Sequence, residues 1–214
     1  VLLVLEDAKG KVIKIRLVSA YAPTSNHTED MHESFRGHLR QAVQEAKQNN
    51  EILIVGADIN ASCGRHDATM DDDIVQSPVG RHGINWVNKA GEQMLSFCGL
   101  NDLCLPKSFF QKNFATRGTW THPRSGKSYE IDQWMMRRED LKRVVDCGTA
   151  QRHSAYSDHT AVFLKIRIAK GLRAHTKPKK SRFSRDRLKD EDTANEFAQA
   201  AEEFVLNAAA AVTE

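Results

Sequence analysis

The sequence contains no apolar run near the roughly 18 residues of a membrane-spanning helix, and no basic N-terminal region typical of a signal peptide. We therefore expect a protein of the nucleus or cytoplasm, neither secreted nor partnered with a membrane. The four cysteines form no CxxC pair, which disfavours a disulfide framework or zinc site and favours reduced structural thiols. Walker, GxGxxG, GxSxG and HExxH motifs are also missing, which removes the common nucleotide-binding and protease classes.

The composition is that of a globular chain. Its 214 residues are 40% hydrophobic and 28% charged, with a net charge of +3, which by itself is too mild to indicate nucleic acid. Basic residues gather after residue 168, however, and predict an exposed basic linker at 169–189. Apolar residues then recur at helical spacing, so we predict three parts: a main domain at 1–168, this linker, and an accessory helix at 190–214.

The hydropathy pattern of the main domain alternates between strands and helices. Residues 1–5 and 12–22 predict a hairpin, and 51–55 is a short apolar run typical of a strand buried on both faces. Apolar residues at helical spacing predict helices at 31–49 and 90–98. The stretch 61–83 is long and polar enough to predict a functional loop.

The remaining elements are predicted from β-branched and aromatic residues. We expect strands at 102–105, 119–122, 128–135 and 161–168, while 138–145 favours either a short helix or the lead into a strand.

Polar residues follow several of these strands, and they come from four separate segments. Asp58 and Asn60 follow the buried strand, and in an extended chain side chains two residues apart point to the same side. A carboxylate and an amide could then meet one ligand, a pairing suited to a phosphate and a water molecule. The other candidates are Tyr21, Asp132 and the pair Asp158 and His159.

Five motifs in order carry a resemblance to a known family. They are Tyr21-Ala22-Pro23, Gly56-Ala57-Asp58-Ile59-Asn60, Thr119-Trp120-Thr121, Ile131-Asp132 and Ser157-Asp158-His159. The series resembles the endonuclease/exonuclease/phosphatase family of metal-dependent phosphodiesterases. Within that family it is most similar to the apurinic-endonuclease-like domains of non-LTR retrotransposons and to proteins of the craniofacial development protein 2 type. The resemblance implies an α/β fold of two packed sheets flanked by helices, in four layers.

The resemblance also implies roles for individual residues in DNA nicking. Asp58 would orient or deprotonate the attacking water, Asn60 would hold a phosphate oxygen, and Tyr21 would contact the scissile phosphate. His159, held by Asp132, would hydrogen-bond the phosphate.

A metal ion and further partners follow from the same resemblance. Asp158 matches a metal-site carboxylate, and the expected ion is Mg²⁺, with Mn²⁺ as the other candidate. The expected partners are DNA and a reverse transcriptase domain downstream in a parent polypeptide.

Two features depart from the family pattern. The family places an Asn and a metal-binding Glu on earlier strands, and neither Glu6 nor Glu29 lies in a matching context. We therefore expect an N-terminally truncated domain with an unpaired sheet edge and exposed apolar surface. In addition, Ala57 separates Gly56 from Asp58, where the family often has Gly-Asp directly.

Several residues have simpler interpretations. Asp58 and Asn60 are common turn residues, and Asp158 with His159 is compatible with a capped turn. Trp120 fits a packed strand position as well as a nucleic-acid contact. Three basic linker residues fit either a solvated segment or phosphate contacts: Lys179, Lys180 and Arg182.

Three functions remain open at this point. The first is a Mg²⁺-dependent DNA endonuclease of retrotransposon type. The second is a non-catalytic remnant that at most binds nucleic acid. The third, a phosphomonoesterase or lipid phosphatase of the same family, is disfavoured by the residues around Trp120 and by the basic linker.

Overall fold

A computed structural model describes residues 1–6, 10–65, 77–150 and 157–168. All of these belong to one compact unit, Val1–Leu172. The predicted basic linker and accessory helix lie outside the described residues, as does the middle of the predicted loop 61–83. Among the described helices, none combines the length and apolarity needed to cross a membrane.

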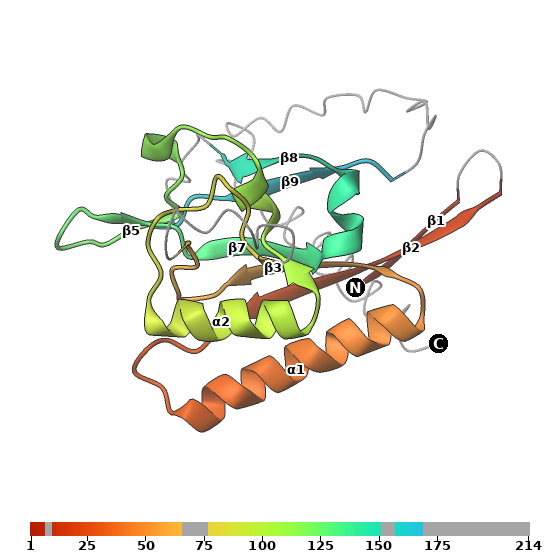
Figure 1. The fold of residues 1–214 in the computed structure, drawn as a ribbon, viewed down its shortest axis with the longest axis horizontal. Coiled ribbons are helices and arrows are strands. Elements are labelled where there is room, and N and C mark those ends of the chain that lie inside the picture. Colours follow the sequence, from red (N-terminus) through yellow and green to blue (C-terminus); the bar gives the residue numbers. More distant parts are fainter. Residues whose placement is uncertain (7–9, 66–76, 151–156, 169–214) are drawn as a thin grey trace, which may run out of the picture. The chain divides into compact units, whose positions relative to one another are not determined.

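A five-stranded sheet forms the centre of the fold (Figure 1). Its strands, in spatial order, are β1 (Leu2–Glu6), β2 (Val12–Tyr21), β3 (Ile52–Asp58), β7 (Asp132–Arg137) and β4 (Leu103–Cys104). Strands β2 and β3 run parallel, whereas β1 with β2, β3 with β7 and β4 with β7 are antiparallel. The polar ends of β2 and β3 therefore meet at one edge of the sheet.

Two helices and two smaller sheets complete the described fold. The helices are α1 (Glu29–Gln48) and α2 (Lys89–Leu100). The small sheets pair β5 (Trp120–Thr121) with β6 (Ser128–Tyr129), and β8 (Val144–Thr149) with β9 (Val162–Ile166). The short 3-10 helices are η1 (Pro106–Phe109), η2 (Phe114–Thr116) and η3 (Arg138–Arg143).

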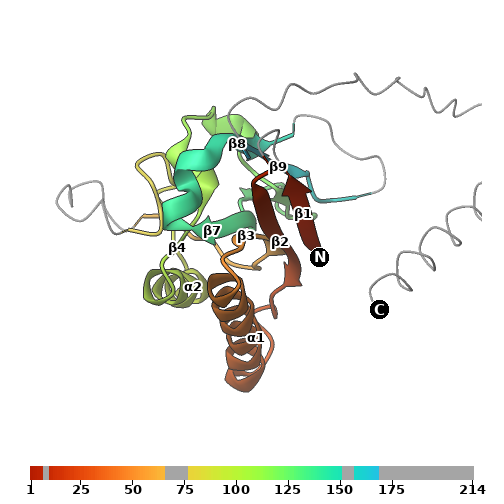
Figure 2. The ribbon, with the colours of Figure 1, turned by 90° about the vertical axis from the view of Figure 1, so that its right-hand side faces the viewer.

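The elements are arranged in layers around two hydrophobic cores. Figure 2 shows α1 and α2 on one side of the central sheet and the β8–β9 sheet on the other. Leu53 and Val55 of β3 belong to the core on the helix side, whereas Ile52 and Ile54 pack in the second core with Ile166 of β9. Such a strand, buried on both faces, was predicted from its continuous apolar run. The α/β class with two packed sheets is confirmed, and three of the four predicted layers lie within the described residues.

Helix α1 buries an apolar stripe on the sheet. Leu39, Val43 and Ala46 are its buried residues, and they share one face because they lie four and seven positions apart. Fully burying a Leu or Val side chain stabilises the fold by about 1.5–3 kcal/mol. Asn88 caps the N-terminus of helix α2, and its side-chain oxygen accepts a hydrogen bond of 2.8 Å from the Gly91 N–H.

The predicted single strand at 128–135 is divided in the structure. Its first part is β6, which pairs with β5, and its second part is β7 in the central sheet. The break falls at Glu130, whose buried carboxylate faces Arg117 at 3.0 Å. Because the N–H groups of Ile131 and Asp132 donate to the Thr119 hydroxyl, the run does not continue as one ladder.

Other expectations are confirmed. Helix η3 leads into β8, so both interpretations of residues 138–145 hold for part of that segment. All four cysteines are free and buried, and burial raises the thiol pKa of Cys63, Cys104 and Cys147 to about 12. Strand β1 lies at the edge of the sheet and exposes apolar side chains, with Val4 59% exposed.

Candidate hydrolytic site

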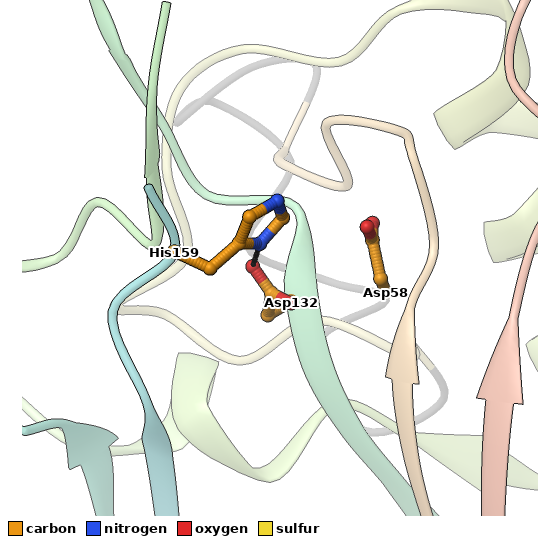
Figure 3. A group of neighbouring side chains, drawn as sticks. All are labelled: Asp58, Asp132 and His159. Carbon is orange, nitrogen blue, oxygen red and sulfur yellow. Dashed lines mark hydrogen bonds and ion pairs between the residues drawn. The ribbon is translucent and has the colours of Figure 1, made fainter. Parts of the chain in front are cut away.

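Three candidate residues meet where β3 ends and β7 begins (Figure 3). Asp58 is the last residue of β3, Asp132 is the first residue of β7, and the two are register partners. Register partners in antiparallel strands direct their side chains to the same face. His159 joins them from the segment before β9, and one ligand atom from each of the three lies within 4.8 Å of the other two.

Strand periodicity places this group on the side of the sheet that faces β8 and β9. Ile54 and Trp134 pack in the core on that side, and Asp58 and Asp132 are an even number of residues away from them. The carboxylates therefore point between the two sheets, at the open end.

His159 and Asp132 form a directed pair. The imidazole Nδ1 lies 2.9 Å from Asp132 Oδ2. An ionised carboxylate only accepts hydrogen bonds, so Nδ1 is the donor and Nε2 is the nitrogen free to act on a ligand. The pair thereby fixes both the tautomer and the orientation of the ring.

The environment of Asp58 favours its protonated form. Burial is the largest cause that raises the Asp58 pKa, and the charge of Asp132 acts in the same direction. The hydrogen bond from the Asn60 N–H to Asp58 Oδ1, 2.9 Å long, and the charge of His159 lower it in part. Two carboxylates facing one space repel each other, which is the situation that a bound cation relieves.

Asn60 does not continue the strand. Its backbone has a φ of 46°, in the left-handed region, and its side-chain Nδ2 donates to the Ala22 carbonyl at 2.8 Å. The extended geometry expected for Asp58 and Asn60 therefore ends before Asn60, because one local hydrogen bond, from the Asn60 N–H to Asp58 Oδ1, and one long-range bond to Ala22 hold Asn60 in a turn. The amide joins the end of β3 to the end of β2, and Asn60 lines a separate 240 Å³ cavity with Trp86 and Trp120.

Tyr21 lies beside the group at the end of β2. It is the register partner of Asp58 across the parallel ladder and is 67% exposed. It does not line the cavity beside the three grouped residues. The structure thus places Tyr21 next to the group, with its side chain in solvent.

Asp158 and Trp120 interact with each other. The Trp120 indole N–H donates to Asp158 Oδ2 at 2.8 Å, and this hydrogen bond is the largest cause that lowers the Asp158 pKa. Asp158 is exposed and is not one of the three grouped residues. Trp120 is half-buried, with its ring centroid 6.4 Å from that of His159. The predicted contacts Lys179, Lys180 and Arg182 lie outside the described residues.

Thr119 positions both members of the histidine–aspartate pair, although the motif Thr119-Trp120-Thr121 indicates no role for Thr119 itself. Its buried hydroxyl accepts hydrogen bonds of 3.0 Å from the backbone N–H groups of Ile131 and Asp132. Its carbonyl accepts from the Thr160 N–H at 2.6 Å. One residue therefore holds the backbone at Asp132 and the backbone next to His159. No periodic signal in the sequence marks such a residue.

A buried ionic cluster forms around Glu130, two residues before Asp132. Glu130 accepts from Arg117 at 3.0 Å, lies 3.7 Å from the Lys107 ammonium and accepts from Gln133 at 3.1 Å. Lys107 is 1% exposed, and burial lowers its pKa. Glu130 and Gln133 flank Asp132 in the sequence. Charged residues in a sequence predict surface, so this buried cluster could not be predicted.

A cavity of 470 Å³ adjoins the group of three. Its wall includes Gly56 and Trp134, and a Cβ atom at residue 56 would lie only 2.8 Å from the Trp134 ring. The Trp134 indole N–H is buried and has no hydrogen-bond partner among the described residues. Gly56 is therefore required for the ring to cover the strand.

Comparison with known proteins identifies relatives at moderate similarity. No protein-family model matches the chain. Craniofacial development protein 2 of Bos taurus is 27% identical over 191 residues, which are 89% of this chain and 30% of the relative. The same protein of Tragulus javanicus is 25% identical over 195 residues, or 91% and 32% of the two chains. The chain thus spans about a third of the length of these curated relatives.

Solved structures share the fold. The endonuclease domain of TRAS1, a telomere-specific non-LTR retrotransposon, has a TM-score of 0.50 and 19% identity, covering 79% of this chain and 70% of that domain. The 3′-5′ exonuclease NExo of Neisseria meningitidis has a TM-score of 0.52 and 13% identity, covering 72% and 64%. The AP endonuclease LMAP of Leishmania major has a TM-score of 0.51 and 13% identity, covering 78% and 54%. Together with the similarity to craniofacial development protein 2, this shared fold confirms the resemblance to the endonuclease/exonuclease/phosphatase family that the sequence motifs predicted.

Proposed function

We propose that this chain carries the hydrolytic residues of a metal-dependent phosphodiesterase that nicks DNA, of the type found in non-LTR retrotransposons. The observation that carries the proposal is the gathering of Asp58, Asp132 and His159 within 4.8 Å at the end of the central sheet. The fold shared with endonucleases and an exonuclease supports the same reaction class.

The residues divide into an acceptor and a donor of protons. Asp58, whose pKa is raised by burial, would orient the attacking water and accept its proton. His159, with its Nδ1–H held by Asp132, would donate from Nε2 to a phosphate oxygen in its doubly protonated form, as negative charge develops there. Tyr21 and Asn60, at the neighbouring strand ends, are proposed to contact the phosphate.

A hard divalent cation fits the donor set. Mg²⁺ is commonly held by one or two carboxylates together with water and substrate phosphate, and Asp58 and Asp132 would supply the carboxylates. When bound, the ion neutralises charge that develops on the phosphate. Asp158, the metal-site carboxylate proposed from the sequence, is the alternative ligand, and its carboxylate here accepts the Trp120 N–H.

Nicking of supercoiled plasmid in the presence of Mg²⁺ tests the proposal. Asp58→Asn and His159→Ala should each lower the rate about 10²- to 10⁴-fold, the usual contribution of a general acid or base. Asp102→Asn is the matched control, because Asp102 is exposed, has a positive φ that Asn also tolerates, and lies at the far end of the sheet. Equal rates for all four proteins would reject the assignment.

The metal ligands can be separated by binding alone. Mn²⁺ affinity, measured by the electron paramagnetic resonance signal of the free ion, should fall in Asp132→Asn if the grouped carboxylates hold the metal. If Mn²⁺ affinity falls only in Asp158→Asn, Asp158 and not the grouped carboxylates holds the metal ion.

A second candidate function is nucleic-acid binding without cleavage. It is favoured by the position of Asp158, which leaves two carboxylates in the group formed by the described residues. DNA binding by wild type with no Mg²⁺-dependent nicking would support this candidate.

The proposed nuclease function also includes its partners. These are DNA and a reverse transcriptase domain in the same polypeptide.

A further inference from the structure

A basic groove lies at the other end of the central sheet from Asp58. It has a volume of 750 Å³ and is bounded by the starts of β2 and β3, the residues after α1, and η3. Five basic residues and two acidic ones line it: Lys11, Lys14, Arg137, Lys142, Arg143, Glu139 and Asp140. The lining therefore carries three more positive than negative charges.

The arginines of the groove are neutralised by its carboxylates. Arg137 lies 2.8 Å from Glu139 and 3.1 Å from Asp140, and Arg143 lies 3.0 Å from the second oxygen of Asp140. Arg137 also donates to the Glu51 carbonyl at 2.7 Å. Because Asp140 is 5% exposed, its two ion pairs hold the side chains of Arg137 and Arg143 in place in the groove.

Lys14 and Lys142 supply uncompensated charge. Lys14 on β2 and Lys142 on η3 are exposed, and neither side chain forms a hydrogen bond or ion pair with another residue in the part of the chain that the structure describes. Both extend from regular elements and not from a long loop, so the spacing between them is set by the fold. Two such lysines, beside arginines that are already paired with carboxylates, are suited to binding an extended anion.

The groove is separate from the candidate hydrolytic site. Strand β3 joins them, with Ile52 in the groove and Asp58 in the site. Six strand steps of about 3.3 Å separate these residues by roughly 20 Å. A phosphate bound by Lys14 is therefore not the phosphate that Asp58 would reach.

We propose that this groove binds the phosphate backbone of a nucleic acid, at a second site that rests on the proposed DNA-directed function. No aromatic residue is among the described residues that line it, and such anchors typically carry the affinity for a protein partner. Ile168, which also lines the groove, lies two residues before Lys170, where the basic segment of the sequence begins. In the sequence, basic residues therefore follow the last residue of the groove, a pattern that favours a repeating anion.

Salt-dependent DNA binding tests the groove. The full chain and its Lys14→Gln/Lys142→Gln variant are compared by fluorescence anisotropy on a labelled 20-base-pair duplex in EDTA, across a series of KCl concentrations. Each lost phosphate contact lowers the magnitude of the log K against log[salt] slope by about 0.9. The variant should therefore lose about 1.8 in slope, which corresponds to roughly 60-fold weaker binding at 0.1 M salt.

A matched variant separates local contacts from net charge. Lys89→Gln/Lys165→Gln removes the same charge from two exposed lysines that do not line the groove. It should change the slope by less than about 0.5, about half of one phosphate contact. Equal slopes for the two double variants, or wild-type slope in the groove variant, would overturn the proposal.

Two further measurements identify the ligand of the groove and distinguish this proposal from the proposed hydrolytic function. Labelled poly-glutamate that binds the wild type more tightly than DNA, and weakens in the groove variant, would assign the groove to acidic proteins and reject nucleic acid. If the wild type binds DNA without nicking it and the groove variant still loses slope, the groove stands while the hydrolytic function fails.

Discussion

Replacement of Thr119 by Val tests how the candidate site is held in place. The substitution keeps the shape of the side chain but removes the oxygen that accepts from the N–H groups of Ile131 and Asp132, each at 3.0 Å. A buried donor left without a partner costs about 1–3 kcal/mol. Because both amides belong to half-buried residues, we take the lower part of that range for each and expect a loss of about 2–3 kcal/mol in the free energy of unfolding.

Urea unfolding at pH 7 measures this loss, and Thr119→Ser is the comparator. Ser keeps the acceptor and removes one methyl group, which costs about 0.8 kcal/mol in buried area. The Val variant should therefore be less stable than the Ser variant by at least about 1 kcal/mol. A Val variant as stable as the Ser variant would refute the role of the hydroxyl.

A spectroscopic signal distinguishes positioning from general stability. The hydrogen-bonded Nδ1 proton of His159 should give a downfield NMR resonance in the wild type and in Thr119→Ser. In Thr119→Val we expect this resonance to broaden or vanish, because the backbone at Asp132 loses its anchor. An unchanged resonance in a folded Val variant would show that Asp132 keeps its place without Thr119.

Three further predictions concern packing, charge and pH. Gly56→Ala should destabilise the fold by about 1–3 kcal/mol in urea unfolding, because its Cβ would lie 2.8 Å from the Trp134 ring, and a Trp134→Val background should reduce that loss. Glu130→Gln should cost about 3–5 kcal/mol by leaving buried cations unpaired, and a loss below 1 kcal/mol in the same assay would contradict this. Burial raises the Asp58 pKa above its ordinary value of 3.8, so the folded state binds the Asp58 proton more tightly than the unfolded chain does. The ionised carboxylate therefore destabilises the fold above its folded pKa, and this effect disappears as the pH falls below 3.8. Asp58→Asn should accordingly be more stable than the wild type at pH 7 and equal to it at pH 3, and equal stability at both values would contradict the shift.

The elements with clear periodicity could be predicted from the sequence. Helix α1 has its apolar stripe four and seven residues apart, and β3 is a continuous apolar run, so each pattern specifies one structure. The strand predicted at 128–135 was wrong in its continuity. The strand is interrupted where the N–H groups of Ile131 and Asp132 bond to the Thr119 hydroxyl, a contact twelve to thirteen residues away in the sequence that no local pattern predicts.

The members of the candidate site could be named from motifs, but their arrangement could not. Whether Asp58 faces Asp132 depends on the register of β3 and β7, which are separated in sequence by α2 and several short elements. The side-chain partners of Asn60 and Asp158 depend on contacts with the Ala22 carbonyl and with Trp120. Such contacts are long-range and follow no local pattern.

Trp120 gives the candidate site an optical label of its own. Its indole donates to Asp158 and its ring lies 6.4 Å from His159, so the fluorescence of a single native side chain senses both neighbours. The chain has three tryptophans, and a variant that retains Trp120 alone would isolate this emission. A ligand arriving at the site would change the same emission, without a dye on either molecule.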